Sequence, residues 1–371
     1  MSAVNSAVYK LKENKSFYLV FVPTVTLVFV FAFLMLIYPQ VAADGVKKGI
    51  SLCLETVIPA LFPFMFAVTL IYDIGIFNIF IQCADGLMYR LFRLPGVALP
   101  IMLMSFLGGF PVGAILIEKA FEDGELTSAR AQRMLMFCVN PGPAFTVSVI
   151  GVGIIGSAKA GAVIYISVTL SSLIVAFLSR FIDTEPVSLN VKRKNSALLC
   201  NASVLSGVIG KATKSMANIC VSILVFSCID SLTEILFSSE GLSIYFGMLS
   251  EVTNGVITAS EHFSLPVVAA VVSFSGLCVH FQVLPVILKL KLKYRLFFAI
   301  RVLTAALSCM LSFVMLQIFP QYDSVISLGI KPQNASLEVP FPVCVWLMVM
   351  CGLFLIGDNY ILSKKLSDKS A

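Results

Sequence analysis

Long apolar runs, separated by short polar segments, dominate the pattern of this chain. Eight of the runs have the length of about 20 residues that a transmembrane helix requires. They cover residues 17–38, 50–73, 134–155, 160–182, 216–238, 265–288, 296–318 and 341–362. The pattern therefore predicts an all-α polytopic membrane protein with about eight transmembrane helices, in which the segment 76–95 lies at the membrane interface.

Helix-breaking residues interrupt two further apolar segments, 97–118 and 243–262. The first contains Gly108-Gly109-Phe110-Pro111, and the second contains Asn254-Gly255. Proline removes a backbone donor and glycine adds backbone freedom, so neither favours a continuous helix. Backbone groups freed inside a bilayer must be covered by protein or by a wet cavity. We therefore predict that both segments are re-entrant hairpins.

The distribution of charge supports this topology. With the N-terminus inside and both broken segments treated as hairpins, most of the 26 lysines and arginines fall on the cytoplasmic side. Making either segment a full span would invert everything that follows it. Arg301 lies near the inner end of its span, and we expect its side chain to snorkel to the interface.

The order of elements predicts two inverted repeats. In each unit a span precedes a hairpin, and a broken span follows it. The second breaks lie at Asn140-Pro141-Gly142-Pro143 and near Ser273-Phe274-Ser275-Gly276. Inverted repeats with broken helices are typical of secondary transporters. The predicted divisions are an N-terminal helix (1–45), a first repeat (46–183), a cytoplasmic linker (184–203), a second repeat (204–320), and an external loop with a C-terminal helix (321–371).

Composition adds a membrane assignment and several exclusions. Hydrophobic residues make up 58% of the chain and charged residues 12%, against about 25% charged in soluble domains. The net charge of +6 reflects topology and does not indicate nucleic acid. The ten cysteines are scattered without a CxxC pair, and the two histidines lie apart. We therefore expect no enzyme activity, catalytic residues, metal or cofactor.

The breaks are the predicted solute site, because a half-helix that begins inside the membrane presents unpaired N–H groups and a partial positive charge. Such ends suit a small anionic or polar solute. The alternative is kinked helices in which glycines only permit close packing. The expected solute-binding residues are Gly108, Gly109, Pro111, Gly113, Asn140, Gly142, Asn254, Gly255, Ser275 and Gly276.

Ionisable residues inside the membrane are costly and are therefore candidates for proton or ion coupling. Glu55 could serve this role or reach interfacial water from a helix end. Glu251 could serve it or lie at a solvated hairpin tip, and His280 could instead be a satisfied polar group between helices. Asp230 and Glu234 fall toward the outer half of their span. Asn140 can cap a half-helix or contact a solute.

Four motifs follow one another in a recognisable order: Leu61-Phe62-Pro63-Phe64, Leu91-Phe92-Arg93-Leu94-Pro95-Gly96, Gly109-Phe110-Pro111-Val112-Gly113-Ala114 and Phe137-Cys138-Val139-Asn140-Pro141-Gly142-Pro143-Ala144-Phe145. Across roughly residues 45–320 the chain resembles the family of sporulation integral membrane proteins typified by YlbJ. That family has nucleoside-recognition Gate domains, shared in part with nucleoside transporters and the ferrous-iron transporter.

The resemblance implies two Gate repeats and, in endospore formers, passage of dipicolinic acid toward the developing spore. It places the protein in the bacterial plasma membrane or a membrane around the forespore. Nucleosides or other small solutes, and a non-transporting scaffold for sporulation proteins, are the alternatives. The expected partners are the solute and membrane lipids, with a homo-oligomer or sporulation membrane proteins as further partners.

Overall fold

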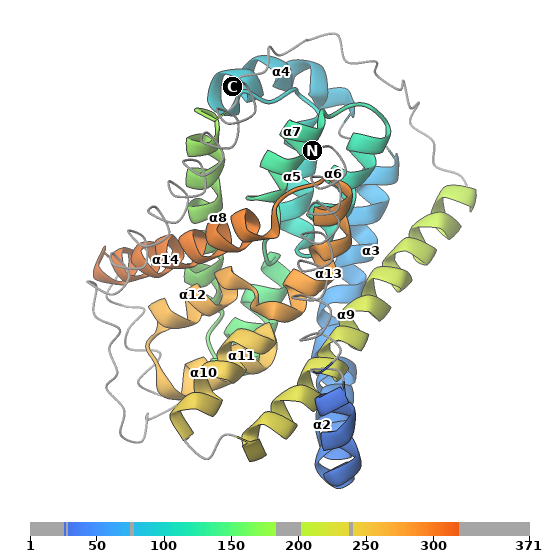
Figure 1. The fold of residues 1–371 in the computed structure, drawn as a ribbon. Coiled ribbons are helices and arrows are strands. Elements are labelled where there is room, and N and C mark those ends of the chain that lie inside the picture. The colour runs from blue at the N-terminus through green and yellow to red at the C-terminus, as the bar shows by residue number, and fades with distance from the viewer. Residues whose placement is uncertain (1–25, 27–28, 75–77, 183–201, 237–239, 319–371) are drawn as a thin grey trace, which may run out of the picture.

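The computed structural model describes residues 26, 29–74, 78–182, 202–236 and 240–318, and every regular element within them is a helix (Figure 1). The all-α fold is therefore confirmed. The first half contains α2 (Pro39–Leu52), η1 (Cys53–Val57), α3 (Ile58–Ile74), α4 (Asn78–Phe92), α5 (Ala98–Gly108), α6 (Val112–Glu122), α7 (Ser128–Leu135), η2 (Ala144–Ile154) and α8 (Ala158–Ser179). The second half contains α9 (Ala202–Leu236), α10 (Glu240–Ser250), α11 (Val252–His262), α12 (Leu265–Phe274), α13 (Gly276–Lys289) and α14 (Tyr294–Ile318).

Five helical stretches among the described residues are long and apolar enough to cross a membrane, which confirms the polytopic architecture. They are Pro39–Ile74, Ala158–Ser179, Ser203–Leu236, Leu265–Lys289 and Tyr294–Ile318. The predicted run 134–155 is divided between the end of α7, a non-helical stretch and η2. Half of the predicted span 17–38 and all of 341–362 lie outside the described residues.

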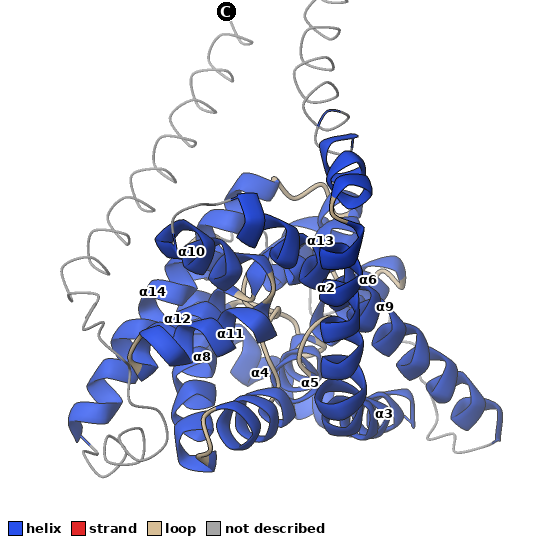
Figure 2. Ribbon diagram, turned by 90° about the horizontal axis from the view of Figure 1, so that it is seen from below, coloured by secondary structure: helices blue, strands red, loops and turns tan. Residues whose placement is uncertain are grey.

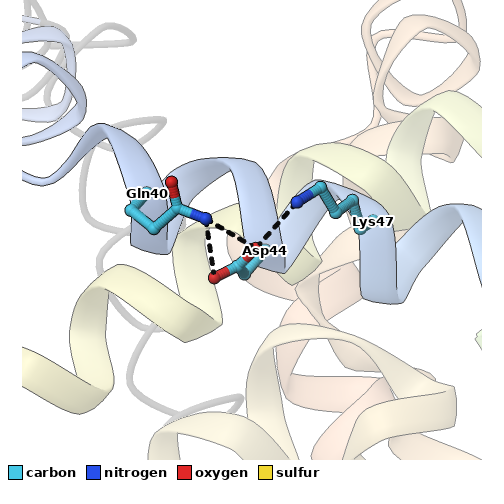
Figure 3. Close-up of polar contacts among 3 residues, drawn as sticks. All are labelled: Gln40, Asp44 and Lys47. Atoms are coloured by element: carbon cyan, nitrogen blue, oxygen red, sulfur yellow. Dashed lines mark hydrogen bonds and ion pairs between the residues drawn. The ribbon is translucent and has the colours of Figure 1, made fainter.

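The segment 39–49, which separates two of the predicted spans, is helical. α2, the π-helical η1 and α3 form one helix of 36 residues, about 54 Å long at 1.5 Å per residue. Figure 3 shows that Asp44 accepts hydrogen bonds from Gln40 (3.4 Å) and Lys47 (3.1 Å) on the exposed side of α2. Pairs at these spacings support a helix. The polar residues therefore extend the helix beyond the apolar run.

The two halves repeat one order of elements. Each has a long helix, a helical hairpin, a broken helix and a final helix. These are α2–α3, α5–α6, α7–η2 and α8 in the first half, and α9, α10–α11, α12–α13 and α14 in the second. α9 packs along both α2 and α3, and α8 packs against α14. α4, part of the predicted interfacial segment, lies across the top of the molecule in Figure 1.

Polar contacts bring the basic segments to one end of the molecule. Lys289, the last residue of α13, forms ion pairs with Glu118 (2.7 Å) and Glu122 of α6. Lys119 and Lys211 both lie beside Asp73 at the end of α3. This shared end contains basic segments that the charge pattern assigns to the cytoplasm, and the positive-inside rule predicts that it faces that compartment.

The buried apolar side chains form two large clusters. One joins the helices of the first half, including α3 and α5–α7, to α13 and the first turns of α14. The other joins η2 and α8 to α11 and α12. Each cluster contains residues from both halves, so burial of apolar surface holds the two halves together around their non-helical segments. Seen from below, these loop segments cross the middle of the molecule, surrounded by helices (Figure 2).

Candidate functional site

The tip of the α5–α6 hairpin packs against the break in the α7–η2 segment through two glycines. Gly109 has a φ of 74°, in the left-handed region that favours glycine. A Cβ on Gly109 would lie 2.8 Å from the backbone nitrogen of Gly142. A Cβ on Gly142 would lie 2.6 Å from the carbonyl oxygen of Leu107. Side chains at these positions would therefore separate the hairpin tip from the break.

The tip of the α10–α11 hairpin packs in the same way against the break between α12 and α13. Ser275 and Gly276 both have positive φ, at 74° and 65°. A Cβ on Gly276 would lie 2.9 Å from the backbone nitrogen of Val252. In both halves a hairpin tip therefore contacts the following broken helix through a glycine that has no space for a side chain.

A second glycine in each hairpin lets its two helices approach closely. Gly113 stands four residues after Gly109, and an added Cβ would lie 2.0 Å from the carbonyl oxygen of Cys138 and 2.7 Å from Ser105 Oγ. Gly255 stands four residues after Glu251, and its Cβ would lie 2.8 Å from the carbonyl oxygen of Met248. At these predicted glycines, the fold therefore has no space for a larger side chain.

Both tips and both broken helices line one cavity of about 40 Å³, which we call the central cavity. It lies where the long helices α3 and α9 face the two hairpins. From the first half it is lined by Gly108, Gly109, Phe110, Gly142, Ala144 and Phe145, among others. From the second half it is lined by Glu251, Val252, Thr253, Cys278, Val279 and Gln282, among others.

Glu251 is a buried carboxylate at the tip of the second hairpin, with 1% of its surface exposed. Its carboxylate accepts hydrogen bonds from the backbone N–H groups of Thr253 and Asn254, both at 2.8 Å, and from Thr253 Oγ1 at 3.1 Å. Glu251 is thus the N-cap of α11, where a negative charge is favoured. The alternative of a solvated tip is wrong, because the side chain is enclosed.

Arg301 connects the two breaks and is fully buried, which corrects the expectation that it snorkels to the interface. Its Nη1 donates to the carbonyl oxygen of Val139 in the first break at 2.6 Å. Its Nη2 donates to the carbonyl oxygen of Ser273 and to Ser275 Oγ (2.5 Å) in the second break. The guanidinium therefore satisfies carbonyls that broken helices leave without partners in the membrane.

Asn140 also serves the first break from a buried position. Its Nδ2 donates to the carbonyl oxygen of Phe137 at 2.6 Å, and its Oδ1 accepts from Ser172 Oγ of α8 at 2.7 Å. Ser105 Oγ donates to the next carbonyl, that of Cys138, at 2.5 Å. Asn140 does not line the central cavity, so in this structure it holds the break rather than facing a solute.

His280 and Glu55 lie away from the central cavity. His280 is buried among aromatic rings, with Nδ1 3.2 Å from Tyr294 Oη and Nε2 3.2 Å from the carbonyl oxygen of Phe274. It is a satisfied polar group between helices. Glu55 lies on the exposed side of η1. Of the three predicted coupling residues, the structure brings Glu251 to the cavity.

The other predicted site residues lie at several different places in the structure. Gly108, Gly109 and Gly142 line the central cavity, whereas Asn254 lines a second pocket described below. The described lining of neither pocket includes Pro111, Gly113, Gly255, Ser275 or Gly276, which contribute to the tips, hairpins and breaks. Sequence reasoning missed Gln282, whose buried Oε1 has no described hydrogen-bond partner and which lines the cavity.

Comparison with known proteins finds similarity to a sporulation membrane protein. It is 25% identical over 329 residues to the sporulation integral membrane protein YlbJ of Bacillus subtilis (strain 168), and the alignment covers 77% of this chain and 80% of that protein. No family model and no solved structure matches the chain. The similarity and the membrane-spanning helices together show a multi-pass integral membrane protein that is similar, over most of its length, to the sporulation integral membrane protein YlbJ.

Proposed function

We propose that this chain is a secondary carrier that moves a small anionic or polar solute through the central cavity. The observation that supports the proposal is that both hairpin tips and both broken helices line this one cavity. Discontinuous helices that meet between two repeats form the binding sites of many secondary transporters. The repeated order of long helix, hairpin, broken helix and final helix supports a description as two inverted Gate-type repeats.

The helix ends at the cavity favour an anionic group on the solute. Residues from the N-terminal turns of η2, α11 and α13 line the cavity. No described side chain caps the N-terminus of η2 or α13, whereas Glu251 caps α11. Uncapped N–H groups and the helix dipole attract carboxylates. A planar dicarboxylate such as dipicolinate is therefore our first candidate, with nucleosides second.

The size of the cavity indicates that the structure is a closed state. A cavity of about 40 Å³ holds about three water molecules, which is too little for a dicarboxylate. A solute could reach the site only if a hairpin tip moved away from its broken helix. Because the chain has no nucleotide-binding motif, a solute gradient, an ion gradient or a separate partner would drive the movement.

Uptake by proteoliposomes that contain the full-length chain tests the proposal. We expect uptake of dipicolinate, and we expect Gly109→Ala to abolish it because the new Cβ would press on Gly142. Gly124→Ala is the matched control, since Gly124 has the same φ of 74° but no neighbour within 4 Å. Its uptake should resemble that of the unmodified protein.

Folded protein that transports neither dipicolinate nor nucleosides would contradict the carrier proposal. Uptake that survives Gly109→Ala would show that transport does not depend on contact between the hairpin tip and the break. Size-exclusion profiles of each variant in detergent separate a loss of transport from a loss of folding.

A further inference from the structure

A second pocket, which we call the outer pocket, lies at the opposite end from the basic segments. Its volume is about 180 Å³, and it is formed by α2, α9, α10 and α11. Asp230 of α9 and Asn254 of α11 both line it. A polar pocket of this size holds several water molecules. The carboxylate of Asp230 is therefore placed beside water on the side that the charge pattern assigns to the exterior.

Asp230 holds the tip of the α10–α11 hairpin through two hydrogen bonds. Ser250 Oγ donates to Asp230 Oδ1 at 2.5 Å, and Asn254 Nδ2 donates to Asp230 Oδ2 at 3.3 Å. These donors stand on either side of Glu251, which lines the central cavity. The short hairpin tip thus separates the two cavities, with a carboxylate on each side.

We propose that Asp230 is a proton-binding latch for this hairpin. A proton from water in the outer pocket would bind one carboxylate oxygen and neutralise the side chain. The neutral acid is a poorer acceptor for Asn254 Nδ2, and any bond that it keeps with the tip, including one that its O–H donates to Ser250 Oγ, would lose its charge assistance. The tip that carries Glu251 would then separate from α9. When the proton returned to water, the carboxylate would be restored and the tip would close.

The chemistry around Asp230 suits a proton better than a metal ion. Both of its oxygens face donors, a hydroxyl and an amide NH₂, whereas metal ions such as Ca²⁺ and Mg²⁺ require several converging oxygens. The other ionisable groups that line the pocket are Lys48 from α2, Glu234 from α9, and Glu261 and His262 from α11. The described lining from α10, Ile244 and Gly247, is uncharged, and Glu251 lies across the tip.

Hydrogen–deuterium exchange of the full-length protein in nanodiscs tests the latch without any solute. We expect acidification to reduce protection of amides 250–255 more than that of amides 108–113, because the α5–α6 tip contains no titratable side chain. Asp230→Asn should leave amides 250–255 less protected at every pH. Glu234→Gln is the matched control, since Glu234 lines the same pocket from α9 but is exposed. It should behave like the unmodified protein.

An equal response of both hairpins to pH, after correction for intrinsic exchange rates, would overturn the latch. So would Asp230→Asn with unmodified protection and an unmodified response to pH. Either result stands whether or not the protein transports a solute, so failure of the latch is distinct from failure of the carrier proposal.

Coupling of the latch to transport rests on the proposed carrier function and has its own measurement. In proteoliposomes, dipicolinate exchange without a gradient tests the carrier, and accumulation driven by external acid tests the coupling. We expect Asp230→Asn to retain exchange and lose acid-driven accumulation. Exchange by the unmodified protein with no response to a pH gradient, or accumulation driven by sodium instead, would overturn proton coupling and leave the carrier in place.

Discussion

The two helical hairpins share a backbone plan but differ in the chemistry of their tips. The α5–α6 tip is glycine, phenylalanine and proline, and it contacts its broken helix through the backbones of Gly109 and Gly142. The α10–α11 tip carries the buried Glu251, and its flanking residues bind Asp230. The comparison suggests that the first hairpin is a fixed wall of the cavity and that the second is the part that responds to charge.

Removal of Arg301 should have the largest effect, because this side chain serves the breaks of both halves. Arg301→Met leaves the carbonyls of Val139 and Ser273 without these donors. The carbonyl of Ser273 keeps the hydroxyl of Ser275 at 3.2 Å, but the loss of two hydrogen bonds from a charged donor costs roughly 3–6 kcal/mol. We expect a large fall in thermal stability in detergent, measured by intrinsic fluorescence. Arg295→Met is the control, since Arg295 is an exposed residue of the same helix, and an equal effect of both changes would refute the assignment.

Alanine at the packing glycines should affect the first hairpin more than the second. Gly113→Ala places a Cβ 2.0 Å from a backbone oxygen, whereas Gly255→Ala places one 2.8 Å away. Overpacking of this kind costs roughly 1–3 kcal/mol, with Gly113→Ala at or above the upper end. A Cβ on Gly210 of α9 would have no neighbour within 4 Å, so Gly210→Ala should leave the stability of the protein unchanged or raise it. Ranked melting temperatures of the three variants test this order.

Loss of the charge on Glu251 should have the smallest effect on stability and should act on the second hairpin alone. Glu251→Gln keeps the shape of the side chain but weakens the cap of α11, at a cost of about 1 kcal/mol. Glu261→Gln, an exposed change on the same helix, is the control. Hydrogen–deuterium exchange tests this prediction, because we expect faster exchange at amides 252–255 in Glu251→Gln than in the unmodified protein. Equal loosening of the α5–α6 tip would contradict the independence of the two hairpins.

The first hairpin and the two breaks could be predicted because they depend on local features of the chain. The predicted turn of the second hairpin at Asn254-Gly255 is wrong, because the chain turns at Glu251, which caps α11, and Asn254 and Gly255 lie inside that helix. Glycine and proline interrupt apolar runs at Gly109 and Asn140-Pro141-Gly142-Pro143, and a membrane does not tolerate uncovered backbone there. Helical structure in 39–49 was harder to predict, because polar residues next to a proline are also typical of a loop.

The roles of Arg301 and Asp230 could not be read from position alone. Arg301 is the eighth residue of α14, close enough to the start that snorkelling is reasonable for an isolated helix. Its contacts depend on how α14 packs beside two breaks that lie 28 and 162 residues away in sequence. The sequence does show an ionisable residue inside a membrane span, and such a residue is costly enough to be a functional candidate. This observation identifies Arg301 or Asp230 as a candidate, but it does not identify the groups that bind it.

The carboxylate on the second tip has an electrical consequence. An elementary charge that crosses the whole membrane field changes energy by about 2.3 kcal/mol per 100 mV, and a shorter displacement changes it in proportion. Movement of the α10–α11 tip would carry Glu251, and its charge when ionised, through part of this field, whereas movement of the α5–α6 tip would carry no side-chain charge. The resting voltage of the cell would therefore bias the position of the α10–α11 hairpin, and it would exert no such force on a side chain of the α5–α6 tip.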